Sequence, residues 1–127
     1  MIYNKPVHNV GYHFIWCPKY RRSVLEGDIC IRLRQLIYEK ASQIGVEVVQ
    51  LEIMPNHVHA FIKSTTKIDP HYIMTNLKGY TSRVLRSEFK EIRSRIPTLW
   101  TRSYYCESVG SLTQEAIEKY IQNQKNV

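Results

Sequence analysis

Hydrophobic and polar positions along the first half of the chain predict a strand, a helix and a hairpin. Residues 10–17 are rich in aromatic and β-branched side chains, which favour a strand. Over residues 28–44, apolar side chains recur at three-to-four spacing, which predicts a helix that Gly45 ends. Residues 46–53 and 57–63 predict two further strands, and the short turn between them indicates a hairpin.

The second half of the chain predicts a helix, a strand and a terminal helix. The helix expected over residues 69–89 begins with an acidic N-cap that is followed by proline, a combination typical of helix starts. A proline within residues 96–98 interrupts the helical pattern, and the aromatic-rich residues 100–106 predict a fourth strand. A Ser-x-x-Gln capping box at 111–114 then predicts the start of a terminal helix.

The order of these elements indicates the fold class. Strand, helix, strand, strand, helix, strand is the split β-α-β-β-α-β pattern. We therefore expect an α+β fold of the ferredoxin-like kind, in which helices cover one face of an antiparallel sheet and a C-terminal helix is added. With 127 residues, of which 43% are hydrophobic, the chain is expected to form one domain. We expect its ferredoxin-like core at 1–110 and the terminal helix at 111–127.

Composition narrows the classes of function. Eighteen Lys and Arg against eleven Asp and Glu give a formal net charge of +7, which favours nucleic acid as a partner. No apolar run approaches the ~20 residues that cross a bilayer, and the N-terminal residues lack a signal-peptide core. The three cysteines are far apart and form no C-x-x-C motif, so neither a disulfide framework nor a cysteine zinc site is indicated. We expect a cytoplasmic protein that is not associated with membranes.

A His-x-His sequence within the predicted third strand is a candidate metal site. Successive side chains of a strand alternate between faces, so His57 and His59 point the same way, about 6.6 Å apart, and Val58 points the other way. Two neighbouring imidazoles are plausible metal ligands. Taken alone, the pair is equally compatible with two exposed or hydrogen-bonded histidines. The remaining histidines, at positions 8, 13 and 71, are assigned no chemistry.

The terminal helix carries a second candidate group. Tyr120 and Gln124 stand four residues apart and therefore share one helix face. A tyrosine can act as a covalent nucleophile, and an amide oxygen can bind a metal ion. Taken alone, the same spacing also fits an ordinary amphipathic helix with a tyrosine at the edge of the core.

Together, these motifs resemble those of one known family over nearly the whole chain. In chain order, the motifs are F-I-W-C-P-K-Y-R-R at 14–22, M-P-N-H-V-H at 54–59, L-K-G-Y-T-S-R at 77–83, L-W-T-R-S-Y-Y at 99–105, S-V-G at 108–110 and Y-I-x-x-Q at 120–124. The set resembles the single-tyrosine transposases of TnpA type, which carry a His-hydrophobic-His motif and are encoded by IS200-like insertion sequences.

The resemblance implies a role for each motif residue. Tyr120 would be the nucleophile, and His57, His59 and Gln124 would hold one divalent metal ion, Mg²⁺ or Mn²⁺. Asn56 departs from the family pattern, in which aspartate is more usual at this position. An asparagine can still hydrogen-bond to a histidine but carries no charge. We therefore expect a weaker or shifted metal dependence rather than an inactive protein.

The resemblance also implies the substrate and the assembly. Members of the family cleave and rejoin single-stranded DNA through a 5′-phosphotyrosine link. They recognise DNA hairpins near the ends of the insertion sequence, and they act as homodimers with composite active sites. Basic and aromatic residues of the matching segments are candidate DNA contacts: Lys19, Tyr20, Arg21, Arg22, Lys78, Arg83, Arg86 and Arg102. Three further tyrosines could stack on unpaired bases (Tyr80, Tyr104 and Tyr105). Lys90, Arg93 and Arg95 fit either a solvated helix end or a DNA-facing surface.

Other functions remain open at this stage. A replication initiator or relaxase shares the chemistry of two histidines and a tyrosine, although its histidine motif usually lies in a larger domain with different connectivity. A domesticated relative would act on chromosomal palindromes. A non-catalytic ferredoxin-like module that binds nucleic acid would explain the charge, the fold and the tyrosines, but it would leave the two spaced motifs unexplained.

Overall fold

The computed structural model describes residues 9–109, 119 and 121–123. Regular elements cover most of the first of these ranges. In chain order they are β1 (Asn9–Trp16), the 3-10 turn η1 (Lys19–Arg21), α1 (Gly27–Ile44), β2 (Glu47–Met54), β3 (His57–Thr65), α2 (Pro70–Glu88), α3 (Lys90–Arg95) and β4 (Tyr105–Val109).

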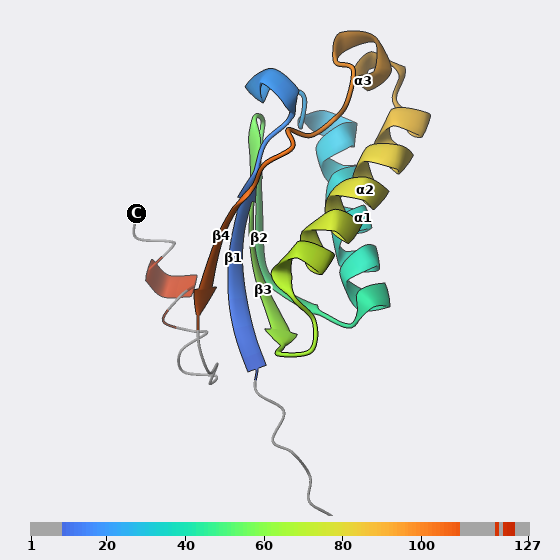
Figure 1. The fold of residues 1–127 in the computed structure, drawn as a ribbon. Helices are drawn as coiled ribbons and strands as arrows, with labels where there is room; N and C mark the ends of the chain where they lie inside the picture. Colours follow the sequence, from blue (N-terminus) through green and yellow to red (C-terminus); the bar gives the residue numbers. More distant parts are fainter. Residues whose placement is uncertain (1–8, 110–118, 120, 124–127) are drawn as a thin grey trace, which may run out of the picture.

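The four strands form one antiparallel sheet in the order β2-β3-β1-β4. Strand β3 lies between β1 and β2, the two strands that α1 connects, as the split β-α-β pattern requires. Helices α1 and α2 both lie on one side of this sheet (Figure 1). The predicted α+β fold, with helices on one face of an antiparallel sheet, is therefore confirmed.

The core lies between the sheet and these two helices. Alternate residues of the central strands point into it, namely Phe14 and Trp16 of β1 and Val58, Ala60 and Ile62 of β3, and each is at most 1% exposed. They pack against the apolar face of each helix, which includes Leu33, Leu36 and Ile37 of α1 and Ile73, Met74 and Leu77 of α2. Because strand side chains alternate, the residues between them point to the opposite face of the sheet.

Local sequence signals set the ends of both long helices. Gly45 follows α1 with a φ of 85°, the left-handed conformation that glycine adopts without a steric penalty. The Asp69 side chain accepts a hydrogen bond of 2.8 Å from the backbone N–H of Tyr72 at the start of α2. Pro70 occupies the first turn, as predicted.

The sequence prediction was wrong over the segment that follows α2. The fourth strand comprises Tyr105–Val109, not residues 100–106, and the short helix α3 precedes it. Trp100 instead packs into the core, where its indole N–H donates a 2.9 Å hydrogen bond to the buried Thr81 hydroxyl. Its ring lies 5.9 Å from that of Trp16. Trp100 thus serves core packing, whereas Tyr105 is 52% exposed and begins the paired strand β4.

The predicted terminal helix falls mainly outside the described residues. Residues 119 and 121–123 are helical and lie on the side of the sheet opposite α1 and α2 (red in Figure 1). Tyr120, Gln124 and the capping box at 111–114 lie outside the described residues, so the division at residue 110 stays a prediction. Within the described ranges, no helix has the length and apolar character needed to span a membrane.

Candidate metal and nucleic-acid site

The two motif histidines begin β3 and lie on the sheet face away from the helices. Val58, between them, is 0% exposed and points into the core, whereas His57 and His59 are half-buried. Their ring centroids are 5.8 Å apart. The strand thus brings the two imidazoles together on one face, as the His-x-His spacing predicted.

The side chain of Asn56 fixes the orientation of His57. Its Oδ1 lies 2.9 Å from His57 Nδ1. An amide oxygen can only accept a hydrogen bond, so His57 Nδ1 must carry the proton. The neutral His57 ring then has its lone pair on Nε2, where a metal ion could bind. Asparagine thus supplies the orienting contact at this position without a negative charge.

A third histidine, from β1, contacts the pair. His13 Nε2 lies 3.3 Å from His59 Nδ1, and the two rings meet edge to face with centroids 4.6 Å apart. Ile15 is the direct strand partner of His59, which makes His13 its diagonal neighbour on the same face. Nothing in the sequence pointed to a role for His13, because only the register of β1 against β3 reveals this contact.

Burial favours neutral imidazoles at this site. The pKa of His59 is lowered from its usual value, first by burial and then by the nearby His57, with a smaller opposing effect from Glu52. The pKa of His13 is lowered by burial and by His59, against an opposing effect from Glu107. Neutral imidazole is the form that binds metal ions, so both shifts favour a metal-binding state at neutral pH.

The donor set fits part of a divalent-metal site. His57 and His59 supply two imidazole nitrogens, which suit many transition metals and are tolerated by Mn²⁺ and Mg²⁺ sites that also contain oxygen ligands. Among residues 9–109, 119 and 121–123, no group of three or more His, Cys, Asp or Glu side chains could hold a metal ion. Any further ligand would therefore be of another residue type, would come from outside the described ranges, or would be substrate or water.

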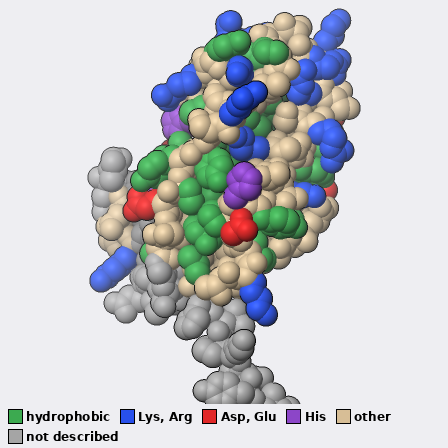
Figure 2. All heavy atoms as spheres, in the orientation of Figure 1, with side chains coloured by type: hydrophobic (Ala, Val, Ile, Leu, Met, Phe, Trp, Pro, Cys, Tyr) green, Lys and Arg blue, Asp and Glu red, His purple; other side chains and the backbone are tan. Residues whose placement is uncertain are grey.

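A basic surface lies at the end of the molecule where β3 begins. Backbone hydrogen bonds join the loop after β1 to the chain after α3, from Lys19 N–H to the Leu99 carbonyl (2.7 Å) and from Thr101 N–H to the Cys17 carbonyl (3.0 Å). This junction brings η1 and the chain that follows α3 together. Figure 2 shows Lys and Arg side chains gathered at this end. The exposed members are Arg21, Arg22, Lys90, Arg93, Arg95 and Arg102, with Lys19 half-buried.

The η1 turn presents an aromatic side chain on this surface. Tyr20 is 67% exposed, and its backbone has a φ of 61°. The next residue, Arg21, also has a positive φ, of 51°. Non-glycine residues seldom adopt this conformation, and functional sites are where such strain is often found. The turn therefore projects a tyrosine ring and basic side chains outward.

Two of the candidate DNA contacts bind the protein's own backbone. The Lys78 ammonium donates to the carbonyls of Thr101, Arg102 and Ser103 at 2.7 to 3.3 Å, and burial lowers its pKa. Arg86 donates to the Ile96 carbonyl at 3.0 Å. Both side chains therefore hold the segment between α2 and β4 in place, which is a structural use of basic residues and not the DNA contact expected from the sequence.

A third candidate lies on the helical side of the molecule. The Arg83 guanidinium lies over the Tyr80 ring, 5.5 Å from its centroid. The Tyr80 hydroxyl donates a 2.7 Å hydrogen bond to Glu39 of α1. These residues therefore connect α1 to α2, on the side of the sheet away from the histidines.

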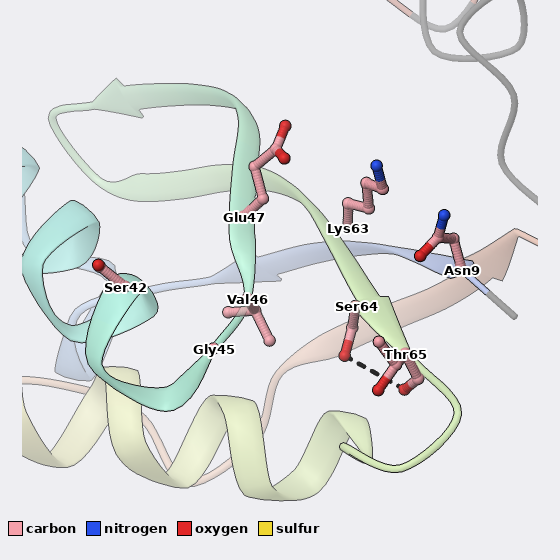
Figure 3. A pocket seen from close by; sticks show the side chains of 8 residues that line it. All are labelled: Asn9, Ser42, Gly45, Val46, Glu47, Lys63, Ser64 and Thr65. Carbon is pink, nitrogen blue, oxygen red and sulfur yellow. Dashed lines mark hydrogen bonds between the residues drawn. The ribbon is translucent and has the colours of Figure 1, made fainter. Parts of the chain in front are cut away.

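An open cavity of about 300 Å³ lies at the end of the sheet opposite His57. It is lined by the ends of β1, β2 and β3 nearest Gly45, with Glu47, Lys63 and Thr65 among its residues (Figure 3). Lys63 stands six positions after His57 and four after His59 on β3, which corresponds to about 20 Å and about 13 Å of extended strand. This cavity is therefore separate from the candidate metal site.

Sequence comparison connects this arrangement with transposition. Residues 6–124 match the family described as Transposase IS200 like. The chain is 33% identical over 120 residues to the ISDra2 transposase TnpA of Deinococcus radiodurans. The matched residues make up 93% of this chain and 86% of that protein. It is 27% identical over 118 residues to the transposase of insertion sequence element IS200 of Salmonella typhimurium, with 91% and 77% covered.

Solved structures show the same likeness. The chain superposes on the crystal structure of a protein from Deinococcus radiodurans R1, described as a transposase, with a TM-score of 0.78, 32% identity and 98% of both chains covered. A REP-associated tyrosine transposase bound to a REP hairpin has the same fold, with a TM-score of 0.63 and 15% identity over 99% of this chain and 74% of that one.

The fold, the histidine pair and these matches define an enzyme of DNA transposition. The chain belongs to the IS200-like transposase family and is of the TnpA type.

Proposed function

We propose that this transposase cleaves and rejoins single-stranded DNA at the ends of an insertion sequence, with Tyr120 as the nucleophile. One observation supports this proposal above the others: His57 and His59 lie together on the sheet face away from α1 and α2, next to a basic surface that bears an exposed tyrosine. A non-catalytic DNA-binding module would need the basic surface but not the paired imidazoles.

The proposed reaction keeps the energy of the cleaved phosphodiester bond in a covalent link between the DNA and the protein. The Tyr120 hydroxyl loses its proton and its oxygen attacks a phosphorus atom of the strand. A bond forms from phosphorus to the tyrosine oxygen while the bond to the 3′ oxygen breaks, and that oxygen takes up a proton. The products are a 5′-phosphotyrosine and a free 3′-hydroxyl. A second 3′-hydroxyl can attack this link in the reverse sense, so strands are rejoined without hydrolysis or ATP.

In this proposal, His57, His59 and Gln124 hold one divalent metal ion, Mg²⁺ or Mn²⁺. When bound, the ion would supply positive charge that polarises the scissile phosphate. The protein's contribution is to orient the ligands: Asn56 accepts a hydrogen bond from His57 Nδ1, so that Nε2 is available. A tyrosine has an ordinary pKa of about 10, so Tyr120 needs such help to lose its proton near neutral pH.

The DNA would lie across the basic end of the molecule. Lys19, Arg21, Arg22 and Arg102 would contact phosphates, together with Lys90 and Arg95 of α3, and the exposed Tyr20 ring would stack on an unpaired base. The REP-associated relative with the same fold is bound to a hairpin. We propose that this chain also recognises hairpins, which present both a duplex backbone and unpaired bases.

We further propose that the enzyme acts as a homodimer with composite active sites. In such a dimer, the terminal helix of one subunit would bring Tyr120 and Gln124 to the histidine pair of the other. Mixing two inactive variants, Tyr120→Phe and His57→Ala, tests this arrangement. Mixed dimers with composite sites recover one working site and some activity, whereas sites formed within single subunits recover none.

An adduct assay tests the central proposal. The protein is incubated with Mg²⁺ or Mn²⁺ and labelled single-stranded oligonucleotides taken from the DNA on either side of its gene. We expect a covalent, denaturation-resistant adduct that Tyr120→Phe abolishes without loss of DNA binding. Tyr38→Phe, an exposed tyrosine on α1, is the matched control and should leave the adduct unchanged. Binding with no adduct under any condition would instead favour the non-catalytic module.

A further inference from the structure

We propose that His13 is a positioning residue that orients His59 for metal binding. In this arrangement, His13 Nε2 accepts the proton of His59 Nδ1 and leaves His59 Nε2 free to face the metal ion. This inference rests on the proposed metal-binding role of His57 and His59. It assigns a function to a β1 residue that lies outside the His-x-His motif.

The contact has a well-defined geometry. His13 Nε2 and His59 Nδ1 are 3.3 Å apart, and the ring planes are inclined at 82°. The backbone beneath His13 is paired on both sides, with Phe61 of β3 and Glu107 of β4. A central strand held by two neighbours can move little, so the His13 ring has a stable base from which to orient its partner.

The proton positions follow from imidazole chemistry. A neutral histidine carries one ring proton, so one nitrogen donates and the other has a lone pair. If His59 Nδ1 donates to His13, the lone pair of His59 lies on Nε2 and can bind a metal ion. If His13 donated instead, the proton of neutral His59 would lie on Nε2 and block that site. Metal binding through Nε2 therefore requires His13 as the acceptor.

The two motif histidines are thus oriented from different parts of the chain. Asn56 pairs with Nδ1 of His57 from the turn before β3, and His13 pairs with Nδ1 of His59 from β1. Both contacts leave an Nε2 atom for the ion. His13 is not itself proposed as a ligand, since its Nε2 atom is used in the contact with His59.

Three substitutions of His13 separate orientation from mere packing. His13→Leu removes the acceptor, and we expect the affinity for Co²⁺ to fall about 10-fold, as is typical when a partner of a metal ligand is lost. His13→Gln should restore most of the affinity, because glutamine Oε1 lies as many bonds from Cα as histidine Nε2. His13→Asn is too short to reach and should behave like leucine. His71→Leu, an exposed histidine of α2, is the control.

Calorimetric titration of the metal-free full-length protein with Co²⁺ measures these affinities. Co²⁺ is chosen because it binds nitrogen ligands more tightly than Mn²⁺. Long-range ¹H–¹⁵N spectra of the unsubstituted protein read the His59 tautomer without any variant. We expect the proton on Nδ1, and a shift toward Nε2 in His13→Leu.

The outcomes distinguish this inference from the proposed function. If His57→Ala loses Co²⁺ binding while His13→Leu keeps it, the role of His13 is refuted and the metal pair stands. If the unsubstituted protein binds no more Co²⁺ than His57→Ala, both the metal pair and the role of His13 fail. A neutral His59 with its proton on Nε2 in the unsubstituted protein would overturn the inference even if a His13 variant failed to fold.

Discussion

Replacing Asn56 by aspartate should strengthen metal binding at the histidine pair. The Asn56 Oδ1 atom lies 2.9 Å from His57 Nδ1, so a carboxylate in the same position would accept the same hydrogen bond with a full negative charge. The histidine would become a more basic ligand, because its Nδ1 proton would be held more strongly.

The expected size of this effect follows from hydrogen-bond energies. A neutral hydrogen bond contributes about 1 kcal/mol net, whereas one to a charged group contributes about 1.5–3 kcal/mol. Because Asn56 is half-buried, solvent screens part of the difference, and we take a gain of about 1 kcal/mol. Since 1.4 kcal/mol corresponds to tenfold in affinity, Asn56→Asp should tighten Co²⁺ binding about fivefold.

Calorimetric titration with Co²⁺ measures the change, and two variants control it. Asn56→Ala removes the acceptor and should weaken binding. Gln43→Glu adds the same charge at an exposed position of α1, on the other side of the sheet, and should leave affinity within error. Equal affinities for the alanine, asparagine and aspartate forms would refute the reasoning, because the hydrogen bond to His57 Nδ1 would then have no influence on the ligand.

Two further predictions concern the core and the basic surface. Thr81→Val should lower the free energy of unfolding by about 1–3 kcal/mol in urea titrations, because the buried Trp100 indole N–H loses its acceptor. Thr81→Ser keeps the hydroxyl and should lower the free energy of unfolding clearly less. Equal losses for the two variants would contradict this explanation. Arg102→Ala should weaken single-stranded DNA binding and reduce the slope of log affinity against log salt by about 0.7, the value for one phosphate contact on a single strand. An unchanged slope would remove Arg102 from the DNA-binding surface.

Much of the fold followed from patterns within short stretches of the chain. The helix caps at Gly45 and Asp69 were predicted because they depend on a few neighbouring residues. The segment around Trp100 was mispredicted because its aromatic residues favour a strand locally, whereas the actual partners of Trp100, which are Trp16 and Thr81, are distant in sequence. The short helix α3 was missed because six residues carry too little periodicity to reveal it.

The sequence alone determined that His57 and His59 share a face, because the alternation of side chains is a property of any single strand. It also determined membership of a transposase family, through motifs spread along the chain. Only the tertiary structure decided that His13 contacts this pair, since the register between β1 and β3 depends on how the whole sheet buries its apolar face. It likewise decided that Lys78 and Arg86 bind backbone carbonyls, because charge alone does not specify which partner a basic side chain will meet.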